Sequence, residues 1–585
     1  VSYQRLVRAG GDLAAAWRGV PIQIAHQPAK QWGHLLRACV ADHASWPESI
    51  KPRAYASSAS GLPWATVRPD EQELGSVENV VDGEWVGGAE LTPVVDPLNG
   101  KTMLHVSEVD ESGLQPYLRC LDECPKSGLH NPLKQPERYL LYGDVSLKVA
   151  EAMRRPEVED FFAELIARVA PKSRGQALGE VRVTRKFFEN FAGDNVRFLA
   201  KSFTAPGDYT GQRTEGLRWP FGKVALITPF NFPLEIPALQ LMGALYMGNK
   251  PVLKVDSKVA VVMSEFLKLL SHCGMPLEDL CFINCRDQVM HRLLLAMQPR
   301  STLFTGSSRV AELLSRDLDG KVKLEDAGFD WKILGPDVPQ RWEDIHYIAW
   351  KADQDAYAFS GQKCSAQSIL FLHQNWHENS ELLALIQERA AKRNLADLTI
   401  GPVLSVTNEE IEAHIAALLD LEGAEVLFGG KRLQGHAIPD CYGSFEPTAV
   451  FVPLRSMLRD AASFDLVTRE IFGPFQIITA YGESELDLVL EATERMSAHL
   501  TAALVSNDVL FRNKVLANTV NGTTYAGLRA RTTGAPQNHW FGPCGDPRAA
   551  GIGTIEAIRS VWSCHREIIF DEGPIPTDPT TLVQS

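Results

Sequence analysis

The chain has 585 residues, of which 45% are hydrophobic and 22% are charged, and its formal net charge is −14. This composition is typical of a water-soluble globular protein with two to four domains. The acidic balance argues against nucleic-acid binding, which needs clustered Lys and Arg, and no run of about 18 apolar residues could span a membrane.

Ten cysteines in a chain of this length do not indicate a disulfide framework. Cys120 and Cys124 are separated by three residues, as are Cys281 and Cys285, but neither pair has a second Cys or His pair at zinc-finger distance. We therefore predict ordinary buried thiols, no metal site and a reducing compartment.

Residues 1–66 differ in composition from the rest of the chain. They contain seven Lys or Arg against three Asp or Glu, and Ser and Ala cluster at residues 55–60. A basic, Ser-rich and acid-poor N-terminal stretch is typical of an organelle transit peptide. A flexible N-terminal extension is the alternative.

From Gly222 onward, short β-branched runs alternate with longer patterns of helical spacing. We predict strands at residues 222–228, 251–255, 280–284, 301–305 and 321–324, and helices at 236–247, 259–270, 287–297 and 310–316. This alternation favours an α/β fold with a parallel sheet covered on both faces, an arrangement typical of nucleotide-binding domains.

A second α/β stretch is predicted between residues 335 and 524. Its helices are expected near residues 343–359, 380–392, 407–419, 485–496 and 508–517, and two of its strands at 368–372 and 475–480. The polar, Gly-rich segment Lys201–Pro220 interrupts the chain just before the first parallel strand, and we expect it to form a protruding hairpin.

The strongest chemical signal is Cys364, in the sequence Ser360-Gly361-Gln362-Lys363-Cys364-Ser365. This segment forms a predicted loop between a helix and an apolar strand, where rigid flanks can hold a reactive side chain in place. A free thiol has a pKa near 8.5, so a nucleophilic Cys needs help from its surroundings. Because a single Cys is more often structural, the assignment depends on further motifs.

Gly361-Gln362-Lys363-Cys364 resembles the nucleophile motif of the aldehyde dehydrogenase superfamily. Four further motifs match this family in its order and at about its spacing: Thr228-Pro229-Phe230-Asn231-Phe232-Pro233, Phe304-Thr305-Gly306-Ser307, Leu324-Glu325 and Glu470-Ile471-Phe472-Gly473-Pro474. The resemblance covers about residues 80–570. It implies a Rossmann-like NAD-binding domain, an α/β catalytic domain and a small β oligomerisation element.

The resemblance also implies roles for three catalytic residues. Cys364 would attack the aldehyde, and the Asn231 amide and the Cys364 backbone N–H would stabilise the resulting alkoxide. Glu325 would activate water to hydrolyse the thioester. The residues that follow Glu325 are Asp326-Ala327-Gly328-Phe329, where the family usually has Leu-Gly-Gly-Lys, so the position of the base stays open.

The implied cofactor is NAD. The residues expected to bind it are Thr228, Pro229, Lys254, Ser257, Gly306, Ser307, Glu470 and Phe472. Gly306 would let the backbone approach phosphates, and Ser307 precedes a helix N-terminus suited to an anion. After Lys254 the sequence departs from the family pattern at Val255, Asp256 and Ser257. The side chain that would bind the ribose 2′-hydroxyl is therefore not identified, and NADP stays an alternative cofactor.

Ser365, Thr533-Gly534-Ala535 and Trp540-Phe541-Gly542 together resemble the Δ1-pyrroline-5-carboxylate dehydrogenases of this superfamily, in their plant-type branch. That group oxidises glutamate γ-semialdehyde to glutamate in proline catabolism. The resemblance implies that Ser365, Gly534 and Ala535 bind the substrate carboxylate and that Phe232 and Phe541 sandwich its stem. The alternatives are another acidic aldehyde, such as succinate semialdehyde bound by Arg529 or Arg531, a CoA-acylating enzyme, or a catalytically silent binding protein.

These patterns also predict the organisation of the chain. We expect an NAD-binding domain at residues 67–334, interrupted by the hairpin at 201–220, and a catalytic domain at 335–525. Residues 526–585 would supply the substrate-anchoring loop, a return to the NAD-binding domain and an oligomerisation segment. The resemblance implies a homo-oligomer, a small-molecule substrate and a location in the mitochondrial matrix.

Overall fold

The structure is a computed structural model that describes residues 61–326, 328–534 and 539–575. The predicted transit segment, residues 1–66, thus lies almost entirely outside the described residues, as does Ala535. Among the helices of the described segments, none is long and apolar enough to cross a membrane.

The first large sheet has seven strands in the order β12-β11-β8-β9-β10-β2-β3. Its bounds are β8 Lys223–Thr228, β9 Lys250–Val255, β10 Cys281–Phe282, β11 Thr302–Gly306, β12 Val322–Asp326, β2 Asn79–Val81 and β3 Glu84–Val86. Strands β8 to β12 run parallel, whereas β2 and β3 extend the sheet in antiparallel pairs. All five predicted strands are confirmed, although β10 is shorter than expected.

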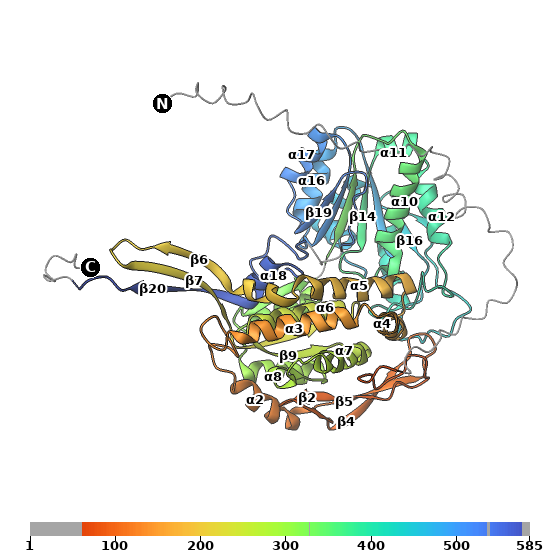
Figure 1. The fold of residues 1–585 in the computed structure, drawn as a ribbon. Helices are drawn as coiled ribbons and strands as arrows, with labels where there is room; N and C mark the ends of the chain where they lie inside the picture. Colours follow the sequence, from red (N-terminus) through yellow and green to blue (C-terminus); the bar gives the residue numbers. More distant parts are fainter. Residues whose placement is uncertain (1–60, 327, 535–538, 576–585) are drawn as a thin grey trace, which may run out of the picture. The chain divides into compact units, whose positions relative to one another are not determined.

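Helices cover both faces of this sheet (Figure 1). The predicted helices correspond to α6 Glu235–Tyr246, α7 Ala260–His272, α8 Asp287–Met297 and α9 Ser308–Asp317. One hydrophobic core joins α6 and α7 to α3 Glu137–Ala152, α4 Pro156–Val169 and α5 Arg174–Asn190. A second core joins α8 and α9 to α2 Gln115–Asp122 on the other face. The sequence patterns predicted no helix or strand before residue 201, so helices α2 to α5 were not anticipated.

The second large sheet has the order β15-β16-β17-β14-β13-β18-β19. Its bounds are β13 Asp330–Leu334, β14 Gln367–His373, β15 Glu425–Phe428, β16 Thr448–Phe451, β17 Phe475–Tyr481, β18 Thr501–Val505 and β19 Thr523–Ala526. Only β15 is antiparallel to its neighbour. One face carries α10 Trp342–Tyr357, α11 Gln374–Asn379 and α12 Leu382–Ala391, and the other carries α13 Asn408–Leu419, α14 Leu454–Leu458, α15 Ala461–Val467, α16 Leu486–Arg495 and α17 Val509–Ala517.

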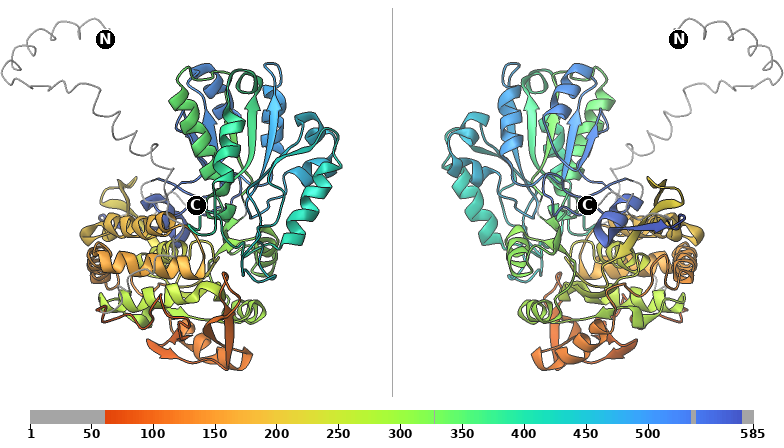
Figure 2. Two further views of the ribbon diagram at one scale, coloured as in Figure 1. Left: turned by 90° about the vertical axis from the view of Figure 1, so that its right-hand side faces the viewer. Right: turned by 90° about the vertical axis from the view of Figure 1, so that its left-hand side faces the viewer.

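The chain passes from the first sheet to the second between β12 and β13, and Figure 2 shows the red to light-green part of the chain below most of the green to blue part. Strand β13 pairs with β14 and β18, so residues 330–334 belong to the second sheet. The expected domain boundary between residues 334 and 335 falls at the end of this strand and stays a prediction. A short strand that is buried on both faces carries no alternating pattern to show which sheet it joins.

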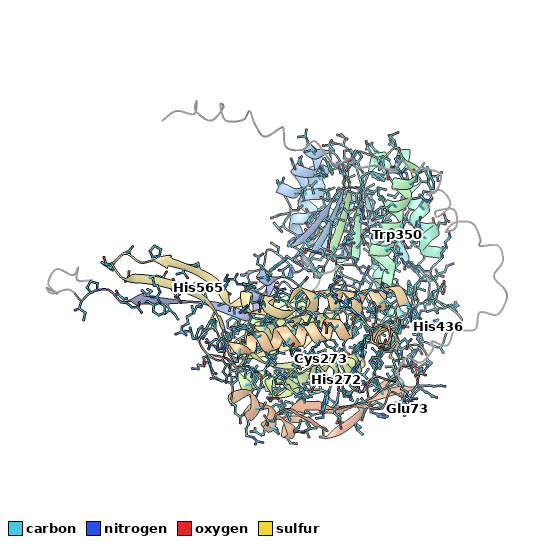
Figure 3. All side chains as sticks on the ribbon, in the orientation of Figure 1. Glu73, His272, Cys273, Trp350, His436 and His565 are labelled. Carbon is cyan, nitrogen blue, oxygen red and sulfur yellow. The ribbon has the colours of Figure 1, made fainter. Side chains whose placement is uncertain are left out.

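The expected hairpin is confirmed by the antiparallel pairing of β6 Lys201–Pro206 with β7 Gln212–Pro220. Strand β20, Ser563–Asp571, pairs with all nine residues of β7 and completes a three-stranded sheet. Figure 1 shows these strands projecting from the helices that cover the first large sheet. On this sheet the rings of Phe203 and His565, the latter labelled in Figure 3, stack with centroids 5.5 Å apart.

The remaining described elements complete the edges of the fold. A small sheet contains β1 Ser76–Val77, β5 Thr102–Glu108 and β4 Glu90–Val95 in that order, and α18 Ile555–Trp562 precedes β20. The four cysteines considered above as possible zinc ligands, Cys120, Cys124, Cys281 and Cys285, are buried free thiols, as predicted. Over the described ranges no group of three or more His, Cys, Asp or Glu could hold a metal ion.

Candidate active site

The site forms where the carboxyl ends of β8, β11 and β12 meet. From β8 the sheet continues through β9 and β10 on one side and through β11 and β12 on the other. In parallel sheets, ligands bind in the crevice at such a change of direction. The strand register places Thr305 beside Glu325 at this edge, and the turn that contains Asn231 follows directly after β8.

The loop before Cys364 has an unusual backbone. Phe359, Ser360 and Gly361 all have positive φ, at 56°, 52° and 70°. Two of them are non-Gly residues, whose left-handed conformation costs of order 1–3 kcal/mol each unless the surroundings enforce it. A Cβ on Gly361 would overlap the carbonyl oxygen of Gly473, so only Gly fits there.

Side-chain hydrogen bonds hold this loop against residues 401–404. Ser360 Oγ donates to the carbonyl of Gly401 (3.0 Å) and accepts from its N–H (2.8 Å). Gln362 donates to the carbonyl of Pro402 (3.0 Å) and accepts from the N–H of Leu404 (2.7 Å). These bonds account for the strained backbone and fix the position from which Cys364 projects.

Cys364 and Glu325 lie next to each other, with Sγ and Oε1 3.9 Å apart. Burial raises the pKa of the Cys364 thiol well above its usual value, and the charge of Glu325 raises it further. The loop after Glu325 packs closely on the nucleophile, because a Cβ on Gly328 would collide with the carbonyl oxygen of Cys364. The altered sequence after Glu325 therefore still brings this carboxyl to the thiol.

A buried ion pair supports the turn that carries Asn231. Lys172 Nζ lies 2.9 Å from Glu180 Oε2, and both side chains are almost completely shielded from solvent. Lys172 also donates to the Asn231 carbonyl (2.7 Å) and lies over the rings of Phe232 and Phe359. The second oxygen of Glu180 accepts the N–H groups that follow the turn. The Asn231 side chain remains available to a ligand, since its Oδ1 has no hydrogen-bond partner within the described part of the chain.

A first pocket of about 230 Å³ opens on one side of Cys364. Its lining residues are Pro229, Phe230, Asn231, Ile236, Thr305, Gly306, Ser307, Glu325, Cys364, Ser405, Glu470 and Phe472. The pocket thus brings together the predicted cofactor residues Pro229, Gly306, Ser307, Glu470 and Phe472. Sequence patterns did not single out Ile236 or Ser405, whose Oγ donates to the carbonyl of Phe472 (3.1 Å).

The chemistry of this pocket fits a dinucleotide. Ser307 is the N-cap residue of α9, whose first turn contains no acidic side chain, so its N–H groups suit a phosphate. A Cβ on Gly306 would press on the Phe304 ring, so the backbone stays bare at this point. Among the described residues the buried Oγ1 of Thr228 has no hydrogen-bond partner, and it suits a ligand polar group.

Three predicted cofactor residues, Thr228, Lys254 and Ser257, do not line this pocket. Lys254, in β9, forms an ion pair with Asp287 at the start of α8 (3.0 Å). Ser257 begins a short 3₁₀ turn capped by Asp256, and Asp256 in turn pairs with Lys258 (2.9 Å). Lys254 and Ser257 lie at or just beyond the carboxyl end of β9, which is one strand away from β8 and the pocket.

A second pocket of about 200 Å³ opens on the other side of Cys364. Its lining residues are Gln176, Gly179, Glu180, Val183, Phe232, Glu235, Ile236, Glu325, Lys363, Cys364, Ser365, Thr533, Gly534, Phe541 and Ile552. Four of the five predicted substrate residues, Phe232, Ser365, Gly534 and Phe541, therefore line the same pocket. The fifth, Ala535, lies outside the described residues. Cys364, Glu325 and Ile236 line both pockets, which places the nucleophile between them.

Helix α5 supplies four of the lining residues that the sequence patterns missed, and Glu235, Ile236 and Ile552 are the others. Gln176, Gly179, Glu180 and Val183 are spaced i, i+3, i+4 and i+7 and so share one helical face. A helical stripe that includes Gln, Gly and Glu could have indicated a functional face of this helix. It does not show what that face contacts.

The loop that contains Gly534 is tied to the nucleophile segment. Thr533 Oγ1 accepts from Lys363 Nζ (3.1 Å), and the Thr532 N–H donates to Asp355 (3.0 Å). Burial lowers the pKa of Lys363 to about 8. A Cβ on Gly534 would collide with Tyr525 Oη. The described lining of the pocket contains no Arg, which is the residue expected for the succinate semialdehyde alternative.

Comparison with known proteins agrees with this geometry. The chain is 60% identical over 520 residues to Delta-1-pyrroline-5-carboxylate dehydrogenase 12A1, mitochondrial, of Arabidopsis thaliana, covering 88% of this chain and 92% of that protein. It is 62% identical over 519 residues to a Linum usitatissimum protein named probable aldehyde dehydrogenase, covering 88% and 93%.

A solved structure shares the fold. Betaine aldehyde dehydrogenase from Staphylococcus aureus in complex with NAD⁺ has a TM-score of 0.70 at 19% identity, covering 86% of this chain and 95% of that chain. The aldehyde dehydrogenase family model matches residues 85–553, which include every described residue of both pockets. The chain therefore belongs to the aldehyde dehydrogenase family.

Proposed function

We propose that the chain oxidises L-glutamate γ-semialdehyde to L-glutamate with NAD⁺. The observation that carries the proposal is the second pocket, which Cys364 lines together with Ser365, Gly534 and the two aromatic residues Phe232 and Phe541. Neutral hydrogen-bond donors suit a substrate carboxylate, and the rings suit its aliphatic stem. The name of the Arabidopsis relative supports the same substrate.

The first step is attack of Cys364 on the aldehyde carbon. Because the thiol pKa is raised in the free enzyme, the thiol must lose its proton to solvent before it attacks, and the Glu325 carboxylate, 3.9 Å away, acts in the later hydrolysis. The oxygen of the attacked carbonyl becomes an alkoxide. The Asn231 side-chain amide and the Cys364 backbone N–H donate hydrogen bonds to it, a contribution of about 10²–10³ in rate per donor.

The first pocket would hold the cofactor and the second the substrate, and Cys364 lines both. Bound NAD⁺ supplies a hydride acceptor, and oxidation of the thiohemiacetal leaves a thioester on Cys364. Glu325, which lines both pockets, then deprotonates the water that hydrolyses this thioester. Thr228, Pro229, Gly306, Ser307, Glu470 and Phe472 would hold the cofactor, with Lys254 and Ser257 contacting its adenosine end.

We further propose a homo-oligomer located in the mitochondrial matrix. The outer edge of β20 faces no other strand within the described segments, and Phe203 and Ile569 expose more than half of their side chains on the same projecting sheet. Unpaired edges and exposed apolar side chains are typical of interfaces. The Arabidopsis relative is named as mitochondrial, and residues 1–66 have a transit-like composition.

Three aldehydes test the substrate assignment: glutamate γ-semialdehyde, 5-oxopentanoate and pentanal, each with NAD⁺ and with NADP⁺. Glutamate γ-semialdehyde and 5-oxopentanoate should each exceed pentanal by roughly 10²-fold or more in kcat/KM. The reason is that pentanal has no carboxylate, so it leaves the hydrogen-bond donors of the pocket unpaired. Ser365→Ala should narrow this gap by about tenfold. Equal kcat/KM values for pentanal and the carboxylates would exclude the proposed substrate while leaving the family unchanged.

A further inference from the structure

The second pocket contains a carboxyl group that the proposed reaction does not use. Glu235 is the first residue of α6, four positions after Asn231, and its side chain lines the pocket beside Cys364 and Ser365. Its exposed fraction is 9%, so it is about nine-tenths buried. No hydrogen bond or ion pair reaches its carboxyl group from the described residues. Burial raises its pKa well above the usual value for Glu, and the neighbouring Glu180 raises it further.

The other charged groups around this pocket already have partners. The oxygens of Glu180 accept from Lys172 and from two backbone N–H groups. The ammonium group of Lys172 is shared between Glu180 and the Asn231 carbonyl. Lys363 donates to the carbonyls of Gln354 and Asp355 and to Thr533. The nearby cations are therefore committed elsewhere, and Glu235 has an unmet need for a donor.

A buried carboxyl group without a partner is costly, and a ligand that brings a cationic donor removes that cost. The proposed substrate carries such a donor, because its α-ammonium group is bonded to the same carbon as its carboxylate. The pocket holds neutral donors at Ser365 and Gly534 for the anion, and one free acidic group. This combination matches a zwitterion better than a simple carboxylate.

We propose that Glu235 is a specificity-determining residue that binds the α-ammonium group of the substrate. This inference rests on the proposed function and extends it from a carboxylate-bearing aldehyde to a 2-amino-5-oxo acid. Glu235 would ionise as the ammonium group enters, forming a charge-assisted hydrogen bond in a site shielded from water. Glu325 remains the base, since it is the carboxyl group found at the Cys364 thiol.

The test compares two aldehydes that differ only in the amino group, glutamate γ-semialdehyde and 5-oxopentanoate. The parent enzyme should prefer the amino acid by about 10- to 100-fold in kcat/KM, the value of one hydrogen bond between charged groups. Glu235→Gln keeps the size and an acceptor oxygen but cannot ionise, and it should reduce the preference by about tenfold or more. Glu265→Gln is the matched control: its carboxylate is also buried but bonds Thr66 and Lys268 and lines neither pocket, so the preference should persist.

A structural or general-base role for Glu235 would lower both rates together and leave their ratio unchanged, which would overturn the inference. Calorimetry supplies a readout besides turnover: the parent should bind L-glutamate more tightly than glutarate, and Glu235→Gln should lose the difference. If Glu235→Gln does not fold, the parent enzyme alone tests the inference. Equal kcat/KM values for glutamate γ-semialdehyde and 5-oxopentanoate, together with equal affinities for L-glutamate and glutarate, would refute ammonium recognition. The carboxylate preference over pentanal is measured separately, so the proposed function can stand when this inference fails.

Discussion

Removal of the Lys172 ammonium group should damage both the stability of the protein and its catalytic site. Lys172→Met keeps the apolar stem between the rings of Phe232 and Phe359 but deletes the donor to Glu180 and to the Asn231 carbonyl. Glu180 then remains as a buried carboxylate with only backbone partners. The turn that positions Asn231 also loses one of its supports.

The structure sets the expected magnitude. Both partners of this ion pair are at most 1% exposed, and breaking a pair buried to this extent typically costs about 3–5 kcal/mol. For a domain of roughly 150–250 residues, this corresponds to a fall of about 6–20 °C in the thermal midpoint. Loss of alignment of the Asn231 donor should lower kcat by about tenfold or more, since complete loss of such a donor costs about 10²–10³.

A double-mutant cycle separates the ion pair from mere loss of volume. Glu180→Gln keeps an oxygen for the backbone N–H groups that Glu180 accepts and removes the uncompensated charge. Lys172→Met/Glu180→Gln should therefore recover at least about 2 kcal/mol relative to Lys172→Met alone. Differential scanning fluorimetry and steady-state kinetics measure the two effects. A fall of less than about 2 °C for Lys172→Met, or a double variant no more stable than the single one, would refute this reasoning.

Five further predictions concern the chemistry and the N-terminal segment. Cys364→Ala should abolish NADH production, whereas binding of NAD⁺, measured by fluorescence quenching, should persist. Cys544→Ala is the control, because Cys544 is an exposed thiol outside both pockets. Turnover by Cys364→Ala would exclude Cys364 as the nucleophile. Glu325→Gln should give a burst of NADH followed by slow turnover, because the thioester accumulates. The same variant should shift the pH midpoint for alkylation of Cys364 by iodoacetamide downward, since the Glu325 charge raises the thiol pKa; an upward shift would contradict this sign. Gly534→Ala should lower kcat/KM for glutamate γ-semialdehyde by about tenfold or more, because its Cβ meets Tyr525 Oη, whereas Gly175→Ala, with open space around it, should not. A fusion of residues 1–66 to a fluorescent protein should enter mitochondria, and a diffuse cytosolic signal would count against a transit peptide.

Periodicity was sufficient to predict the parallel strands of the first large sheet and the helices between them, whereas only β14 and β17 of the second sheet were predicted as strands. The turn after β8 and the Cys364 loop were found because their residue types are chemically specific and follow one another in a characteristic order. Glu325 was expected from the same pattern, although the departure at residues 326–329 left its position open. The distance of 3.9 Å between Glu325 and Cys364 could not be predicted from the sequence, because it depends on the packing of Gly328 against the nucleophile loop.

Contacts between distant segments explain what the sequence could not predict. Helix α5 lies more than 170 residues before Cys364, and nothing in the local sequence around Glu180 shows that it faces a pocket. Glu235 reads as an ordinary first-turn acid of a helix, a position that favours Glu for electrostatic reasons alone. Its unpartnered state emerges only when the partners of Lys172 and Lys363 are known.

The pairing of β7 with β20 has a consequence for biosynthesis. About 340 residues separate the end of β7 from the start of β20, so the hairpin is made long before its third strand. At about 5–20 residues per second, the ribosome needs roughly 17–70 s to complete that interval. Throughout this time β7 presents a nine-residue unpaired edge, the kind of surface on which nascent chains associate incorrectly. The projecting sheet is therefore the part of the molecule for which chaperone protection during synthesis matters most.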